Sequence, residues 1–324
     1  LTNEKHALYH LERLFKMLFF SVAIFISVNN KKQLLTILFV GLAAFFIQNL
    51  FQVLEFFAND RATVQGGGLS LLVFSFIMLQ KKISPVLKIF LVLCIFLVVG
   101  SIFLSGTRRG VGALFIIIIL TLYYNYSNIK ISRLIFPSVA LLLSSYVFYG
   151  FATSNRINQT MRIINFEDNG AWGGRNILWE AGALMVYEKP VLGHGFGVSN
   201  QIMGKYVQDK SYRETKYRMH NSYLKAWAEL GIVGITLLLI ILYRSVRIFF
   251  KAAFWFRAQK DWASYALLFG TSMHLLGLSM EGFFGWSAYL DKVFWFYIAL
   301  ALTLHKVIIL YSANKNIGIT YARQ

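Results

Sequence analysis

Two short polar segments stand beside apolar runs and contain side chains that can take part in chemistry. Arg108 and Arg109 lie between two apolar runs, and His220 and Asn221 come directly before another. An arginine guanidinium presents a planar fork of donors that matches phosphate oxygens. Histidine titrates near neutral pH and can accept a proton from a hydroxyl group. The two segments therefore predict an anion-binding group and a general base.

Each segment also has a purely structural interpretation. Arginines at the end of a span can reach up to lipid phosphates, and a histidine can anchor the start of a helix at the headgroup level. Two arginines in so short a connection must lie at or slightly within the membrane surface, where a charge is costly unless it is paired. A bound anion is therefore the interpretation that we favour for Arg108 and Arg109.

The elements that must position these residues are membrane-spanning helices. Of the 324 residues, 57% are hydrophobic and only 14% are charged, whereas about a quarter of the residues in a soluble domain are charged. This excludes the soluble and disordered classes. The net charge of +18 could suggest a nucleic-acid partner, but the apolar runs are too long and too frequent for a nucleic-acid-binding domain. We predict an all-α, polytopic membrane helix bundle without a nucleic-acid partner.

An apolar helix of about 20 residues can cross the hydrocarbon layer. We predict nine spans, at residues 14–28, 34–51, 67–80, 86–104, 111–126, 134–152, 221–243, 262–280 and 287–310. If every second connection is cytoplasmic, the inside segments are 29–33, 80–88, 127–133, 244–260 and 305–324, which hold fifteen Lys and Arg residues and no acid. This bias places residue 1 outside and residue 324 inside. Because the chain begins with Leu1, we expect further spans upstream.

The longest connection, residues 153–219, lies outside in this topology and is too long for a passive link. We therefore divide the chain into N-terminal membrane helices (1–152), a large periplasmic loop (153–219) and C-terminal membrane helices (220–324). Nine basic residues in the loop outnumber six acidic ones. That surplus suits an anionic ligand, although a solvated charged surface would have the same composition.

Within the loop, the segment that begins at Gly174-Arg175 predicts a helix lying against the membrane and ending at Lys189-Pro190. Three glycines then follow in the five residues Gly193 to Gly197, around His194. Glycine allows a positive φ and a close approach of backbone to a ligand. The segment lacks the lysine of a phosphate-binding P-loop, so it is either a tight turn or a phosphate cradle.

Other polar residues carry less information. No pattern of metal-ligand spacing appears, so we expect neither a bound metal nor a cofactor. The single cysteine, Cys94, lies within an apolar run and predicts a small packing group. His274, Glu281 and Asp291 could instead line a proton or substrate path, as in a secondary transporter or flippase.

Several of these motifs together resemble the O-antigen ligase family. His220-Asn221, nine residues and Gly231-Ile232-Val233-Gly234 are similar to the family's histidine motif. Thr107-Arg108 after an apolar span resembles its arginine motif. Further similar segments are Asn59-Asp60-Arg61, Gly174-Arg175 with Trp179, and Lys189-Pro190. The resemblance runs from about residue 50 to the end of the chain.

The resemblance implies a metal-independent inverting glycosyltransferase in the bacterial inner membrane, with its active site facing the periplasm. Its partners would be an undecaprenyl-diphosphate-linked glycan donor, a lipid A–core acceptor and membrane lipids. Arg108 and His220 would be catalytic, Arg108 on the diphosphate and His220 on the acceptor hydroxyl. The residues expected to bind substrate are Arg61, Arg109, Arg175, His194 and Asn221. An O-antigen polymerase or a protein O-oligosaccharyltransferase would share the donor chemistry and stays open as an alternative.

Overall fold

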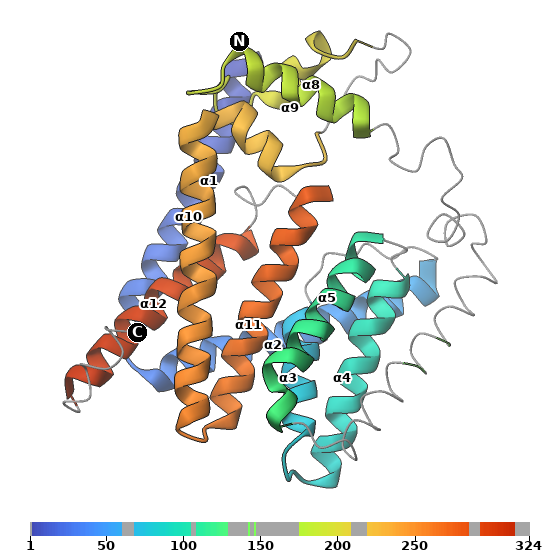
Figure 1. The fold of residues 1–324 in the computed structure, drawn as a ribbon, viewed down its shortest axis with the longest axis vertical. Coiled ribbons are helices and arrows are strands. Elements are labelled where there is room, and N and C mark those ends of the chain that lie inside the picture. Colours follow the sequence, from blue (N-terminus) through green and yellow to red (C-terminus); the bar gives the residue numbers. More distant parts are fainter. Residues whose placement is uncertain are drawn as a thin grey trace. The chain divides into compact units, whose positions relative to one another are not determined.

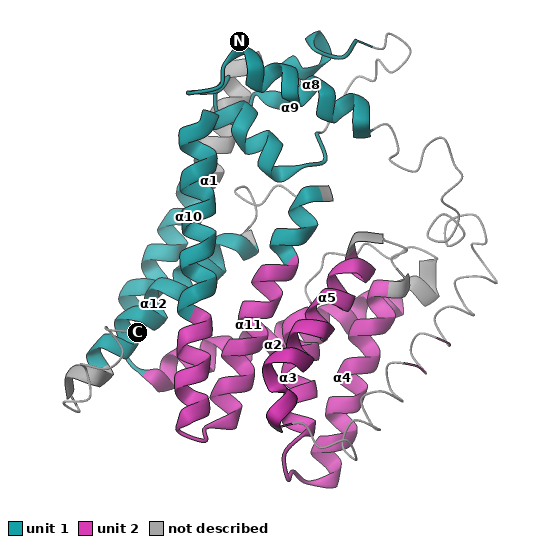
Figure 2. Ribbon diagram, viewed as in Figure 1, with its two compact units in different colours: residues 1–30, 169–248, 278–324 teal, residues 31–168, 249–277 magenta. Residues whose placement is uncertain are grey.

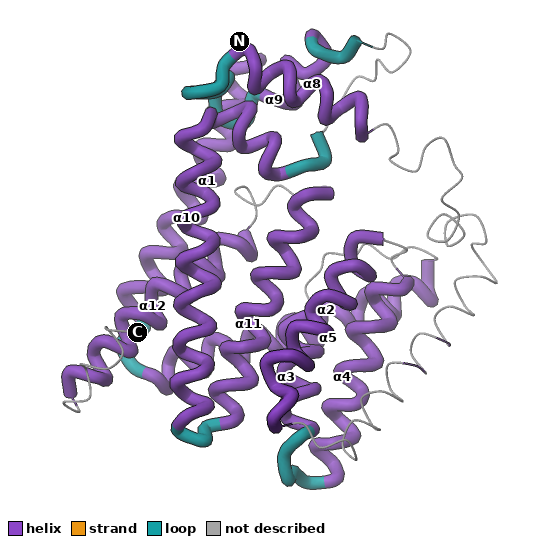
Figure 3. The backbone as a smooth tube through the Cα atoms, in the orientation of Figure 1, coloured by secondary structure: helices purple, strands orange, loops and turns teal. Residues whose placement is uncertain are grey.

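The computed structural model describes residues 2–59, 68–104, 108–128, 142, 146, 175–208, 219–284 and 292–314. All regular structure in these residues is helical, as predicted (Figures 1 and 3). The α-helices are α1 (Thr2–Ser27), α2 (Lys31–Asn59), α3 (Leu69–Leu79), α4 (Pro85–Leu104), α5 (Arg108–Asn125), α8 (Arg175–Glu188), α9 (Ser199–Ile202), α10 (Ser222–Ala258), α11 (Trp262–Glu281) and α12 (Lys292–Asn314). The 3-10 turns are η1 (Tyr126–Asn128), η2 (Met203–Lys205) and η4 (Gly282–Phe284).

Each predicted span coincides with one of these helices, except 134–152, which lies almost wholly outside the described residues. Among the described helices, four are long and apolar enough to cross a membrane, at Lys31–Leu54, Pro85–Ile102, Ser222–Ala258 and Val293–Leu310. Shorter apolar stretches occupy Phe15–Ser27, Leu69–Leu79 and Gly110–Asn125. The chain is therefore a helical membrane protein, and the number of nine spans stays a prediction.

The helix that contains the predicted span 221–243 extends beyond that span. Residues 244–260 are predicted to connect two spans, and α10 continues through them to Ala258, so that only Gln259 to Asp261 separate it from α11. Arginine and lysine are good helix formers, and their long stems allow a charge to reach water from a helix. The basic residues that mark the end of the apolar run therefore do not end the helix.

The described helices belong to two compact units (Figure 2). Unit 1 comprises residues 1–30, 169–248 and 278–324, and unit 2 comprises residues 31–168 and 249–277. In unit 1, α1 packs along α12. The Ser21 hydroxyl donates to the Trp295 carbonyl at 3.3 Å, and the Lys306 ammonium donates to the Phe25 carbonyl at 2.7 Å.

In unit 2, α2, α3, α4 and α5 pack against one another (Figure 1). Val53 and Leu97 form an apolar contact between α2 and α4, and beside it the buried Ser101 hydroxyl donates to Asn49 Oδ1 at 2.6 Å. Helix α11 approaches α3 closely, because a Cβ on Gly270 would lie 2.7 Å from the Ser70 carbonyl oxygen. Small residues that allow such approaches are typical of helix contacts in membranes.

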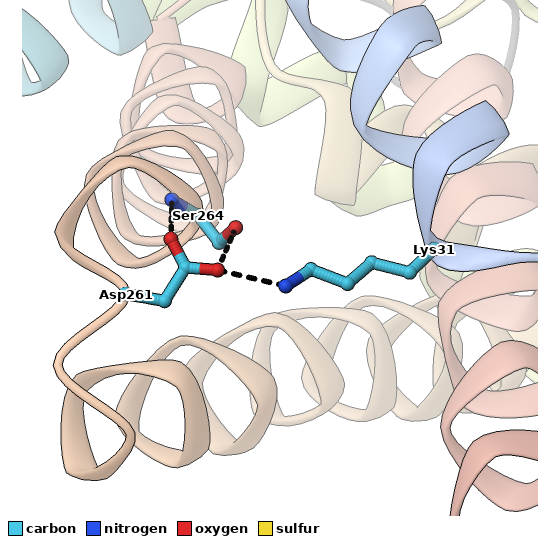
Figure 4. Close-up of polar contacts among 3 residues, drawn as sticks. All are labelled: Lys31, Asp261 and Ser264. Carbon is cyan, nitrogen blue, oxygen red and sulfur yellow. Dashed lines mark hydrogen bonds and ion pairs between the residues drawn. The ribbon is translucent and has the colours of Figure 1, made fainter.

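The connection between α10 and α11 is held by Asp261, the one acidic residue next to the basic segments (Figure 4). Its carboxylate accepts from the Lys31 ammonium at 2.8 Å and from the Ser264 hydroxyl at 2.8 Å. It also accepts from the Ser264 backbone N–H at 3.2 Å, as an N-cap of α11 does. Burial opposes ionisation of Asp261, but the bonds from Lys31 and Ser264 outweigh it and lower the pKa of the carboxyl below its ordinary value of 3.8.

Two substitutions at this position separate the ion pair from the cap. Asp261→Asn keeps the cap and removes the charge, so at neutral pH it should destabilise the folded state by only about 0.5 kcal/mol, because both partners are partly exposed. Asp261→Ala also removes the cap and should cost about 1 kcal/mol more. Thermal unfolding of the purified protein in detergent measures both effects.

The pH dependence has a definite sign. Because folding lowers the pKa of Asp261, its stabilising contribution is present above 3.8 and is lost as the pH falls through the folded-state pKa. The difference in stability between the parent and Asp261→Asn should therefore vanish in acid. A stability difference that grows on acidification would contradict the assignment. The control is Lys32→Gln, which removes an exposed charge from the same helix as Lys31.

Candidate active site

Helix α10 carries the predicted histidine motif and is broken near its beginning. Gly231 has φ 68° and ψ −171°, so the helical hydrogen bonds are interrupted there, and the tube in Figure 3 changes direction near the start of α10. This combination of angles is essentially restricted to glycine. A break in a membrane helix frees backbone groups, which must find partners elsewhere.

The partners come from the glycine-rich turn that follows α8. In place of the helical bonds, the N–H groups of His194 and Gly195 donate to the carbonyls of Ala228 and Glu229, each at 2.9 Å, and the Ile232 N–H donates to the Pro190 carbonyl at 2.8 Å. The backbones touch, because a Cβ on Gly231 would lie 1.9 Å from the Val191 carbonyl oxygen and one on Gly193 would lie 2.4 Å from the Glu229 carbonyl carbon. The turn therefore fills the break in α10.

A buried carboxylate closes the same junction. Glu229 is fully buried, and its oxygens accept from the Gly197 N–H at 2.9 Å, the Ser199 N–H at 3.2 Å and the Ser199 hydroxyl at 2.5 Å. The Lys225 ammonium lies 3.8 Å from the same carboxylate. Of the two interpretations of the glycine-rich segment, the tight turn is confirmed: Gly193, Gly195 and Gly197 all have positive φ, and two amides of the loop bind an anion that belongs to the protein itself.

Helix α8 packs its apolar side against protein. Leu178, Ala181 and Met185 form a core with Met203 and Met219, and the side chain of Met219 reaches the surface of α8 at Gly182, where a Cβ would lie 2.8 Å from its Cε. The predicted helix is therefore present, but its buried face is covered by α9, η2 and α10 rather than by lipid. Figure 1 shows α8 and α9 at the end of α10 where that helix begins.

His220 lies between two anchored neighbours. Met219 is buried in the α8 core, and Asn221 caps α10, because its Oδ1 accepts from the N–H groups of Tyr223 and Leu224, each at 3.0 Å. His220 itself is exposed and has φ 48°, an uncommon conformation for a residue other than glycine. The backbone thus holds one exposed imidazole at the start of α10.

A second attachment fixes the start of α10 from another direction. The Tyr223 hydroxyl donates to the Ser279 carbonyl at the end of α11 at 2.7 Å, and the Tyr223 ring packs on Phe283 with centroids 4.5 Å apart. Together with the turn and the core of α8, this contact leaves the helix segment before the break little freedom to move. That rigidity is what a catalytic side chain requires.

The other predicted site residues are placed as follows. Arg175 is half-buried and begins α8 in unit 1, together with His220. Arg108 and Arg109 begin α5 in unit 2, and their side chains lie outside the described part. Arg61 lies outside the described residues. Arg108 belongs to unit 2 and His220 to unit 1, so their pairing in one site stays a prediction.

His194 is engaged within the turn. Its Nε2 lies 2.9 Å from the Met185 carbonyl and its ring lies against Tyr206. Burial and the Glu188 carboxylate raise the pKa of Tyr206 to about 12, so its hydroxyl remains a donor to Glu188. His194 therefore helps to hold the turn, and its predicted contact with substrate is untested.

Two of the three polar residues that could line a transport path are buried within the protein. His274 is fully buried and packs against the ring of Phe45 with centroids 4.9 Å apart. Glu281 is buried at the end of α11, and Asp291 lies outside the described residues.

The role of Glu229 was not predicted from sequence. A carboxylate four residues after Lys225, within an otherwise apolar run, was the available signal, since residues at this spacing lie on one helix face and an intramembrane charge needs a partner. In the sequence, Gly231 belongs to the motif that begins at His220, but nothing in that motif predicts a break in the helix.

Replacement of Gly231 should disrupt the junction. Gly231→Ala places a Cβ against a backbone oxygen in a conformation that alanine avoids. We therefore expect the free energy of unfolding to fall by at least about 2 kcal/mol, and we expect proteases to cleave the turn. The control is Gly112→Ala in α5, where a Cβ would meet nothing within 4 Å. This substitution should stabilise the helix by about 0.5 to 1 kcal/mol. Equal thermal stabilities in detergent would contradict the docking.

Removal of the buried carboxylate should be similarly severe. Glu229→Ala removes the carboxylate that accepts from the loop amides and lies beside the Lys225 ammonium. We therefore expect the free energy of unfolding to fall by about 3 kcal/mol. The matched control is Glu180→Ala on the exposed side of α8, which should be nearly neutral. Thermal unfolding and proteolysis of the turn would show whether the two variants differ.

A comparison with known protein families concerns this same region. Residues 92–239 match a family model described as O-antigen ligase. In addition, 159 residues are 28% identical to an uncharacterized protein of Haemophilus influenzae, over 46% of this chain and 40% of that protein. The matched region begins in α4, includes both arginines at the start of α5, and ends beyond the break in α10. The match of 92–239 covers the elements that carry these motifs, so this region of the chain is similar to the O-antigen ligase family.

Proposed function

We propose that the chain acts as an O-antigen ligase. It transfers a glycan from undecaprenyl diphosphate to a sugar hydroxyl of lipid A–core, at the periplasmic face of the bacterial inner membrane and without a metal. The observation that carries the proposal is the exposed His220, held between the buried Met219 and the helix cap Asn221. A base held in this way can meet a substrate without reorganisation of its own backbone.

The proposed reaction is a single displacement. The acceptor hydroxyl oxygen attacks the anomeric carbon on the face opposite the diphosphate and passes its proton to His220. The bond between the anomeric carbon and the phosphate oxygen breaks, and its electron pair leaves with the diphosphate. The configuration at the anomeric carbon is therefore inverted.

The leaving group accumulates negative charge as this bond breaks. Arg108 is proposed to bind the diphosphate, with assistance from Arg109 or Arg175. Fixed cations at a boundary of low dielectric constant stabilise such charge strongly. Arg61, Asn221 and His194 are proposed to contribute to substrate binding near the same site.

A reconstituted transfer assay tests the proposal. It contains the purified full-length protein, an undecaprenyl-diphosphate-linked glycan, lipid A–core and a chelator, and the products are resolved on a gel. We expect glycan on lipid A–core, a decrease of about 10²-fold or more for His220→Ala and a similar decrease for Arg108→Ala. Arg108→Lys should restore little, because lysine lacks the fork of donors, and Arg109→Ala should be milder.

Two substitutions of exposed residues serve as controls for the transfer assay. His305→Ala and Arg247→Ala change exposed residues far along the chain from the motifs and should leave transfer unchanged. Longer lipid-linked chains in place of ligated lipid A–core would indicate a polymerase with the same donor chemistry. Near-normal transfer by His220→Ala would exclude the histidine as the base.

A further inference from the structure

The turn at the end of α8 presents large apolar side chains outward. Tyr187 is 86% exposed, Val191 57% and Leu192 78%. They lie within six consecutive residues, which we call the 187–192 turn, and the exposed Glu188 and Lys189 stand between them. Large apolar side chains that are exposed close together mark a surface that contacts a lipid or another protein.

The height of the 187–192 turn along α10 is fixed by backbone hydrogen bonds. The Pro190 carbonyl accepts from the Ile232 N–H at 2.8 Å and from the Trp227 indole N–H at 3.3 Å. The adjacent Val191 carbonyl lies against Gly231. Val191 and Leu192 are therefore level with the stretch of α10 between Trp227 and Ile232.

The exposed face of α10 shows where the bilayer lies along this helix. Its large exposed apolar side chains are those of Trp227, Ile232, Val233, Leu237, Leu239, Ile240 and Tyr243. Trp227 and Tyr243 mark the two ends of this apolar band, and Arg244 and Arg247 follow directly. From the break at Gly231 to Tyr243, twelve residues of helix rise about 18 Å, which is more than half of the hydrocarbon thickness of about 30 Å. Tryptophan and tyrosine are enriched at both membrane interfaces, so Trp227 marks the interface at which α10 begins.

From this placement we infer that the 187–192 turn inserts into the leaflet at the beginning of α10, with the side chains of Tyr187, Val191 and Leu192 among the lipid acyl chains. The backbone contacts place Val191 and Leu192 at the depth of the exposed Trp227 and Ile232 of α10. The exposed Lys189 within the turn suits a neighbouring lipid phosphate. The large loop is thereby anchored to the membrane by its own turn as well as by α10.

Single-cysteine fluorescence in vesicles tests the insertion directly. The natural Cys94 is buried and is replaced by alanine in the full-length protein. Leu192→Cys and, separately, Val191→Cys then carry an environment-sensitive nitrobenzoxadiazole label. Leu237→Cys on the exposed face of α10 is the lipid-facing control, and Lys205→Cys, exposed in η2, is the water-facing control. The vesicles contain only phosphatidylcholine and phosphatidylglycerol, with or without nitroxide-labelled lipids.

We expect the labels at 191 and 192 to emit at shorter wavelength than the label at 205. They should also be quenched several-fold more by a nitroxide near the headgroup, and several-fold less by aqueous iodide. A label at 192 that behaves like the one at 205 would overturn the proposal, because it would show that the turn lies in water beside an intact bilayer. The result does not depend on glycan transfer.

Discussion

The docking of the turn after α8 into the break of α10 is the contact on which the rest of unit 1 depends. A helix that is interrupted within a membrane-spanning segment exposes carbonyl and N–H groups where water is scarce, and each unpaired group costs several kcal/mol. Here the freed groups are bound by Pro190, His194 and Gly195. Neither element can keep its conformation alone, because the turn also relies on the carboxylate of Glu229 for two of its amides.

This mutual dependence links the loop to the histidine motif. The spacing of nine residues between Asn221 and Gly231 corresponds to a short helix segment with a cap at one end and a break at the other. His220 stands just before that segment, on a strained backbone whose neighbour Met219 is buried in the α8 core. Strain of this kind persists only where the surroundings over-determine the conformation, and here the cap, the core and the Tyr223 contact do so. Such a segment suits a group that must meet its substrate in one orientation.

The helices themselves could be predicted from the sequence, because a bilayer requires long apolar runs and leaves few other folds open. The end of α10 could not be predicted, because Arg244 and Arg247 indicate the membrane boundary and a helix can continue through them. The break at Gly231 was also hidden, because a glycine in an apolar helix usually indicates close helix packing, as Gly270 does against α3. Of the candidate site, residue types and order along the chain identified His220 and the arginines. The partners of Glu229 come from a segment thirty residues away and depend on tertiary contacts that no local pattern encodes.

The position of the break also explains the character of the turn that fills it. Irregular backbone is tolerated at membrane depth only where protein covers it. On one side the turn is held by α10, which accepts from the N–H groups of His194 and Gly195 and donates to the Pro190 carbonyl. Beside these bonds it carries the exposed Val191 and Leu192, whose apolar side chains suit contact with lipid. The glycines provide the close approach to α10, and the apolar residues beside them allow that approach to lie at the membrane interface. The same short segment therefore completes a broken helix and meets the bilayer.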